Sequence, residues 1–370
     1  MFVLVIVLYR AYNIIFGMNF NGEFMVIKKI STECVADTLY KKLKNDSNYS
    51  RLLDCLKDRS FIESPVETSD VLKEKGEPSA NNMNRCIIIT VFHNWSKYKV
   101  GYRFDYDLIN TLVGDGEDIE IPSKVILDNM PYPFIWIDNE FVKDSTNYYG
   151  VFVSLQSEVA LTENGDELYD LCIFPVPEME EGFLECYKIP LLKNMNVSLA
   201  QIHSLHEYQE RKLLELYPQY RQDSEKLKAN NKRAGFDEEY AWIRRIFPMV
   251  LYLCCCNKDI SDRKSSTPKE KYDNSKRAKK GTKEYDVGFR IGSVIRSKKT
   301  SSDKNDSLEI EKSIGREHSN HKSPVPHLRR GHFHHYWTGK KGEEKKLIVK
   351  YINSLYVIGQ PDVTLIHPVK

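Results

Sequence analysis

The first third of the chain changes from a helical pattern to a polar segment and then to an apolar run. Leucines recur near helical spacing among lysines and aspartates in residues 31–60, which predicts helices. Residues 62–84 are polar, with prolines, glycine and an asparagine cluster, and predict a loop. Cys86–Phe92 is nearly continuously apolar. Periodicity does not separate a buried strand from a buried helix over so short a run, so both stay open.

Between residues 98 and 190 the pattern becomes that of strands. Short apolar or alternating runs occupy Phe134–Ile137, Gly150–Leu155, Leu168–Phe174 and Phe183–Ile189. Asn164-Gly165, between two of these runs, is the strongest local hairpin signal in the chain. We expect an antiparallel meander here, preceded by a short helix at Asp105–Leu112.

Helical patterns return after the meander. Ser198 is placed to cap a helix that runs to about Leu216, before a charged, exposed segment at residues 219–236. Asp237–Cys256 is apolar nearly all round, which predicts a core helix that Pro248 kinks or divides.

The final third alternates between polar segments and short apolar ones. Residues 258–284 and 297–325 are rich in Lys, Ser and Asp and predict mobile loops. Val287–Ile295 between them is amphipathic. Lys345–Val357 alternates as a strand or hairpin, with Leu347, Val349 and Tyr351 on one face.

These patterns predict an α+β fold: a central antiparallel sheet flanked by helices, with long basic loops inserted before the C-terminal strands. The predicted divisions are a helical N-terminal region (1–84), an acidic α+β body (85–257), a basic loop (258–284), a basic strand region rich in His, Arg and aromatic residues (285–358) and a tail (359–370).

The net charge of +2 conceals an uneven distribution. Residues 261–370 carry 25 Lys and Arg against 13 Asp and Glu, whereas residues 1–260 carry 29 against 39. A basic C-terminal part on an acidic body favours contact with an anionic partner, although a solvated basic linker would show the same excess. The eight cysteines form no CxxC pair, which indicates a reducing, cytoplasmic compartment. The apolar run Met1–Leu8 is too short to span a membrane, so we expect a buried element there and no membrane partner.

One segment combines residue types that bind phosphates, stack on bases, ligate metals or move protons. It runs from Pro326 to Lys340 with the sequence PHLRRGHFHHYWTGK. As a strand it would place His332 and His334 on one face and His335 on the other.

Four interpretations of this segment stay open. We favour nucleic-acid binding, in which arginines contact phosphates and aromatic rings stack on unpaired bases. The residues assigned to that role are His327, Arg329, Arg330, His332, His334, Tyr336, Trp337 and Lys340. A metal site lacks a third ligand at fixed spacing, and a ribonuclease would use histidines as general acid and base. In the fourth, Tyr336 and Trp337 close the core while the histidines bond to backbone carbonyls.

No phosphate-cradling glycine loop, HExxH pair or nucleophile elbow occurs in the chain. We therefore assign no catalytic residue, no metal and no cofactor.

The segment Pro326–Trp337 resembles the C-terminal motif of the second family of type V-A anti-CRISPR proteins, Pro-His-Ile-Arg-Arg-Gly-His-Trp-His-x-Tyr-Trp, with Leu328 and Phe333 as conservative departures. Weaker similarities precede it at Asn129–Asp138, where Tyr132-Pro133 replaces an acidic-aromatic pair, at Ile246–Cys254 and at Gly288–Arg296. The resemblance covers residues 85–358.

The resemblance implies an inhibitor, encoded on a mobile element, that lowers production of a type V-A CRISPR effector in the cytoplasm of a bacterial host. The implied partners are the nascent N-terminal peptide of the effector and its mRNA or the ribosome. On this hypothesis the acidic body binds the peptide, the basic C-terminal strand contacts RNA, and loss of the mRNA follows.

Overall fold

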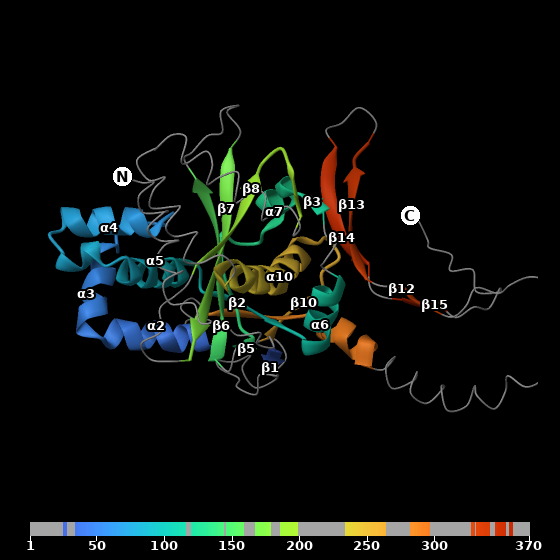
Figure 1. The fold of residues 1–370 in the computed structure, drawn as a ribbon, viewed down its shortest axis with the longest axis horizontal. Coiled ribbons are helices and arrows are strands. Elements are labelled where there is room, and N and C mark those ends of the chain that lie inside the picture. Colours follow the sequence, from blue (N-terminus) through green and yellow to red (C-terminus); the bar gives the residue numbers. More distant parts are fainter. Residues whose placement is uncertain are drawn as a thin grey trace, which may run out of the picture.

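The computed structural model describes the chain from residue 25 to residue 357, with gaps (Figure 1). The described residues are 25–27, 34–115, 120–143, 146–158, 167–178, 186–198, 234–263, 282–296, 327–329, 331–340, 345–352 and 355–357. The predicted N-terminal apolar element, the Asn164-Gly165 turn and the loop at 297–325 lie outside them.

A nine-stranded sheet forms the centre of the molecule. Its strands are β1 (Met25–Ile27), β2 (Val100–Phe104), β4 (Phe134–Ile137), β5 (Glu140–Lys143), β6 (Thr146–Glu158), β7 (Leu168–Pro177), β8 (Tyr187–Leu192), β10 (Ile260–Asp262) and β11 (Lys283–Val287). Every neighbouring pair is antiparallel except β2 with β4 and β2 with β11. The predicted α+β class and the β6–β7–β8 meander are therefore confirmed.

Side chains of the central strand β4 alternate between the two faces of the sheet. Ile135 and Ile137 of β4 join a cluster with helices α6 (Tyr106–Asp115), α7 (Ser123–Asn129) and α10 (Ala234–Cys254), whereas Phe134 and Trp136 join one with α2 (Val35–Asn45) and α5 (Met83–Tyr98). A sheet buried on both faces by helices on either side accounts for its continuous apolar runs. The run Cys86–Phe92, which fitted either a strand or a helix, lies in α5.

The loop predicted for residues 62–84 is wrong. Helix α4 (Pro65–Glu74) and the 3-10 turn η1 (Pro78–Asn81) occupy this segment, between α3 (Ser47–Cys55) and α5. Ser64 accepts a hydrogen bond from Glu67 N and caps α4, with Pro65 in its first turn. The buried face of α4 includes Thr68 and Ser69, whose hydroxyls bond to Thr90 and to the Ala80 carbonyl. These polar core residues weakened the apolar pattern.

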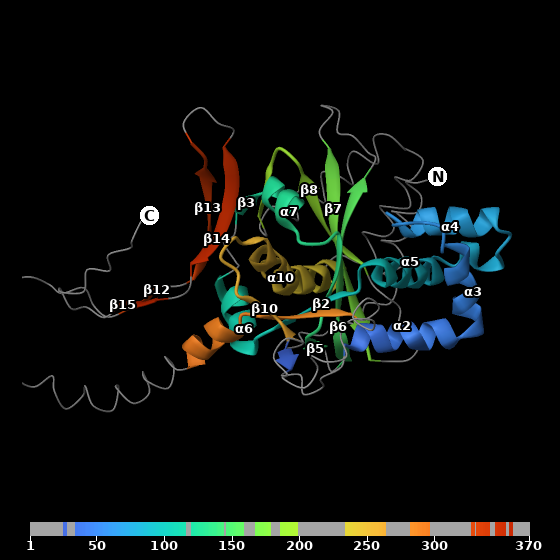
Figure 2. The same cartoon turned by 180° about the vertical axis from the view of Figure 1, so that it is seen from behind.

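The apolar character of α10 follows from its position. It packs against β7 and β8 on one side and against a C-terminal strand, β14 (Lys346–Ile352), on another, with α6 and α7 also in contact (Figure 1, Figure 2). Trp242, Ile246, Phe247 and Val250 are all buried. The core helix predicted at Asp237–Cys256 is confirmed, and it contains Pro248.

Three two-stranded sheets complete the described fold: β3 (Glu120–Pro122) with β9 (Asn196–Ser198), β12 (His327–Arg329) with β15 (Leu355–Val357), and β13 (His332–Thr338) with β14. Ser198 ends β9, and the helix predicted after it lies outside the described residues. The predicted loop at 258–284 begins and ends with β10 and β11, so only its middle lies outside them. None of the described helices has the length and apolar content needed to cross a bilayer.

Candidate binding site on the C-terminal hairpin

Strands β13 and β14 form an antiparallel hairpin at the edge of the molecule, away from the central sheet (Figure 2). Directly opposed pairs include Phe333 with Tyr351, His335 with Val349 and Trp337 with Leu347. Opposed residues project to the same face of a hairpin. Leu347, Val349 and Tyr351 are buried against the core, which confirms the alternation predicted for this strand.

The face of β13 that is turned toward the core is covered at one end only. Phe333 is half-buried and its ring lies 5.1 Å from that of Tyr351. Farther along, His335 is exposed and Trp337 retains 60% of its surface. The idea that Trp337 closes the core is therefore wrong, although Leu347, opposite it on β14, is buried.

The opposite face of β13 gathers rings and cations. The rings of His334 and Tyr336 stack at 4.4 Å between centroids, and His332 lies 6.3 Å from His334. Lys350 on β14 places its Nζ 5.8 Å from the Tyr336 ring centroid. A cation beside stacked aromatic rings is suited to nucleobases, phosphates or acidic side chains.

The hairpin is held to the core by the segment that follows α10. Cys256 N donates to the Val349 carbonyl at 2.9 Å. The Asn257 side chain accepts from Tyr351 N at 3.0 Å and donates to the Tyr351 carbonyl at 2.8 Å. This segment therefore occupies the edge of β14 that faces away from β13.

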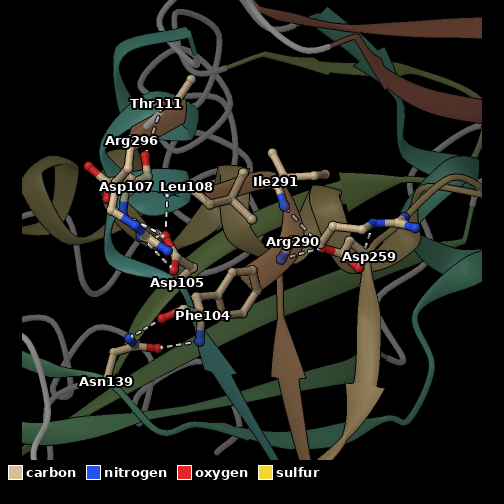
Figure 3. A network of polar contacts seen from close by, with 10 residues as sticks. All are labelled: Phe104, Asp105, Asp107, Leu108, Thr111, Asn139, Asp259, Arg290, Ile291 and Arg296. Carbon is tan, nitrogen blue, oxygen red and sulfur yellow. Dashed lines mark hydrogen bonds and ion pairs between the residues drawn. The ribbon is translucent and has the colours of Figure 1, made fainter. Parts of the chain in front are cut away.

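The same segment fixes a second element, the helix at residues 289–296 (Figure 3). Asp259 accepts hydrogen bonds from Arg290 N and Ile291 N, and so caps this helix. At the other end, Arg296 Nη1 lies 2.9 Å from Asp105 Oδ2 and 2.8 Å from Asp107 Oδ2. Hydrogen bonds to Asp107 and Asp105, at the start of α6, raise the pKa of Arg296.

Two glycines allow this helix to approach α6. A Cβ at Gly292 would lie 1.9 Å from Asp105 Oδ1, and one at Gly288, whose φ is +73°, would lie 2.0 Å from Leu108 Cδ2. Larger residues do not fit at either position unless the Asp105 or Leu108 side chain moves. The predicted amphipathic island is thus a docked helix, and it leads into the segment that precedes β12.

The structure describes seven of the eight predicted nucleic-acid-binding residues, and two of these, His327 and Arg329, by their backbone alone. His332, His334 and Tyr336 share the outer face of β13, whereas Trp337 projects to the other face and Lys340 follows the strand. His327 and Arg329 lie in β12, and their side chains, like Arg330 as a whole, are outside the described part of the chain. The predicted set is therefore not one continuous surface in the part described.

Sequence reasoning missed two residues of this site. Lys350 could have been found, because Lys346 and Lys350 alternate with the buried Leu347, Val349 and Tyr351 and so share the outer face. No local sequence pattern marks Asn257, because its role depends on a contact with Tyr351, 94 positions away.

Two other findings bear on ion binding. Among the described residues, no three His, Cys, Asp or Glu side chains converge as metal ligands require. A pocket of about 190 Å³ between α2, α3 and α5 is lined by residues that include Lys44, Lys57, Lys97 and His93. Burial lowers the pKa of His93 to about 4, so this histidine is neutral at pH 7.

The family model of the AcrVA2-like proteins, described as the anti-CRISPR type V subtype A2 family, matches residues 102–357. That range contains the central strands from β2 onward, α10 and the β13–β14 hairpin. A search of the curated proteins finds no match.

A solved structure titled "Crystal structure of AcrVA2" is similar to this chain. The similarity has a TM-score of 0.49 at 15% sequence identity and covers 89% of this chain and 100% of that one. The family model, which spans well over half of the chain, decides the assignment. The chain belongs to the anti-CRISPR type V subtype A2 family.

Proposed function

We propose that this protein lowers production of a type V-A CRISPR effector by recognising the effector's nascent N-terminal peptide and promoting loss of its mRNA. The observation that carries the proposal is the family match over residues 102–357. The activity is placed in the cytoplasm of a bacterial host, where the effector is translated.

The charge distribution supports a division of labour between two parts of the chain. The C-terminal part carries the basic excess, and the described part of the hairpin presents Lys340, Lys345, Lys346 and Lys350 with the His334–Tyr336 stack. Cations beside exposed rings bind single-stranded nucleic acid through phosphate contacts and base stacking. We assign RNA contact to this outer face and, separately, to His327, Arg329 and Arg330, which precede β13 in the sequence.

Co-expression tests the proposal. A type V-A effector gene is expressed with and without this protein, once with its native first codons and once with the N-terminal codons replaced. We expect both the mRNA and the protein of the native gene to fall, and those of the recoded gene to persist. Unchanged levels of the native effector would overturn the proposal.

A second assay separates binding from catalysis. The purified protein is incubated with single-stranded RNA in the absence of ribosomes. Binding without cleavage is expected. Cleavage that is abolished in His332→Ala would instead assign ribonuclease chemistry to the hairpin.

A further inference from the structure

The outer edge of β13 has backbone groups that no described element uses. In an antiparallel pair, a residue directs both its N–H and its C=O either toward the partner strand or away from it, and the direction alternates along the strand. Val349 and Tyr351 bond through their backbone to Cys256 and Asn257. Both residues therefore point away from β13.

The pairing register of the hairpin gives the direction of the backbone groups on β13. His335 opposes Val349 and Phe333 opposes Tyr351, so the backbone groups of these two residues point away from β14. Because this direction alternates along the strand, the backbone groups of Trp337 point away from β14 as well. The residues that alternate with these, His334, Tyr336 and Thr338, form the ladder with β14. The side-chain hydrogen bond from Thr338 Oγ1 to the Lys346 carbonyl is consistent with this direction. Within the described residues, β13 pairs with β14 alone.

In the described part of the chain, the His335 carbonyl meets a side chain in place of the backbone N–H of a neighbouring strand. With the proton on Nδ1, the neighbouring His334 ring donates to this carbonyl at 3.0 Å. An imidazole from the adjacent residue thus takes the place that a neighbouring strand's N–H would fill. An incoming strand could displace it, because His334 is exposed.

We infer that an extended peptide adds to β13 as a further strand and bonds to the backbone of Phe333, His335 and Trp337. Such strand addition takes affinity from main-chain hydrogen bonds and specificity from alternate side chains. This inference rests on the proposed function, and it moves peptide binding from the acidic body to the hairpin edge.

The two faces of the hairpin specify the chemistry of the peptide. Side chains of one parity would lie beside Trp337, which is 60% exposed, and beside the Phe333–Tyr351 ring pair, so apolar residues are expected there. Side chains of the other parity would lie beside His334, Tyr336 and Lys350, where acidic or polar residues fit. The ligand is therefore a segment in which apolar and acidic or polar residues alternate.

A backbone-selective substitution tests the inference. His335→Pro removes one outward N–H and leaves the β13–β14 ladder intact, because proline is tolerated where a strand's N–H faces solvent. His335→Ala removes the same side chain and keeps the N–H. Fluorescence anisotropy would measure binding of a labelled peptide with the first residues of the effector. We expect His335→Pro to weaken binding by about tenfold, the equivalent of one lost hydrogen bond, and His335→Ala to bind nearly as the parent does.

The ligand supplies an independent test. Peptides N-methylated at every second residue in one parity lose the N–H groups that face β13, whereas methylation in the other parity spares them. One series should fail to bind and the other should bind. Equal binding of both series, or of His335→Pro and His335→Ala, would overturn strand addition.

Amide hydrogen exchange of the full chain distinguishes the possible occupants of the edge. In the free protein, Phe333, His335 and Trp337 should exchange faster than His334, Tyr336 and Thr338, and the peptide should slow the first set. Slow exchange of the first set without peptide would show that another segment or a second copy covers the edge, and would refute the inference. Slowing by single-stranded RNA instead of peptide would refute it as well.

These outcomes are separable from the proposed function. If co-expression lowers the effector but the peptide leaves the three amides unprotected, the strand-addition inference fails and the proposed function stands. If the peptide protects them but the effector persists, the proposed function fails and the peptide-binding edge remains.

Discussion

The side chain of Asn257 bonds to both backbone groups of Tyr351, at 3.0 Å to the nitrogen and 2.8 Å to the oxygen. An amide side chain thus pairs with the outer edge of β14 as a neighbouring strand would. This leaves β13 as the outermost strand of the hairpin in the part of the chain that the structure describes. The position of the candidate site therefore depends on a residue at the exit of α10.

Asn257→Ala should release the hairpin from the core. Two partly buried backbone groups of Tyr351 lose their partners, so we expect a loss of about 1–3 kcal/mol in the free energy of unfolding. Urea denaturation measures it. Asn257→Asp keeps the acceptor and loses the donor, and should fall between the parent and the alanine variant. Equal stability of all three proteins would contradict the assigned role.

Gly292→Ala should destabilise the protein although alanine favours helices over glycine. The new Cβ would lie 1.9 Å from Asp105 Oδ1, and that carboxylate is held by Arg296 and by Asp107 N. We expect a cost of about 1–3 kcal/mol from the forced displacement of the Asp105 carboxylate from these partners. The neighbouring exposed Ser293→Ala is the matched control and should be close to neutral. A Gly292→Ala variant more stable than the parent would show that this close approach is absent in solution.

His93 should make stability depend on pH in the acid range. Burial lowers its pKa from 6.5 to about 4 in the folded state, so the unfolded chain binds the proton more readily between these values. Stability from this group is complete above about pH 6.5 and falls as pH drops toward 4, by no more than about 3 kcal/mol because solvent in the adjoining pocket screens the charge. Urea midpoints measured from pH 7 to pH 4 should therefore fall less steeply in His93→Gln. Parallel pH profiles for the two proteins would exclude His93 as the source.

Much of the fold could be predicted because apolar spacing dominates it. The meander and α10 follow from runs whose side chains are buried, such as Phe152, Ile173 and Trp242. Helix α4 was missed because Thr68 and Ser69 occupy core positions there and satisfy their hydroxyls through long-range hydrogen bonds. The parallel pairing of β2 with β4 and β11 depends on crossovers that periodicity does not encode.

The candidate site was predicted as a segment, but its surfaces were not. Residue type and alternation placed His332 and His334 on one face, as found. Which face meets the core is decided by Val349 and Tyr351 on the partner strand. The exposure of Trp337, opposite the buried Leu347, depends on tertiary packing that alternation along the strand does not encode.

The hairpin's role in lowering effector production is the central claim, and substitution of Trp337 tests it most directly. The steady-state level of a type V-A effector is measured by quantitative immunoblot during co-expression with the parent, Trp337→Ala or Phe289→Ala. Both aromatic side chains are exposed, at 60% and 41%, so neither substitution should affect folding. We expect the effector to be depleted by the parent and by Phe289→Ala and to persist with Trp337→Ala. Depletion by Trp337→Ala equal to that by the parent would contradict the account.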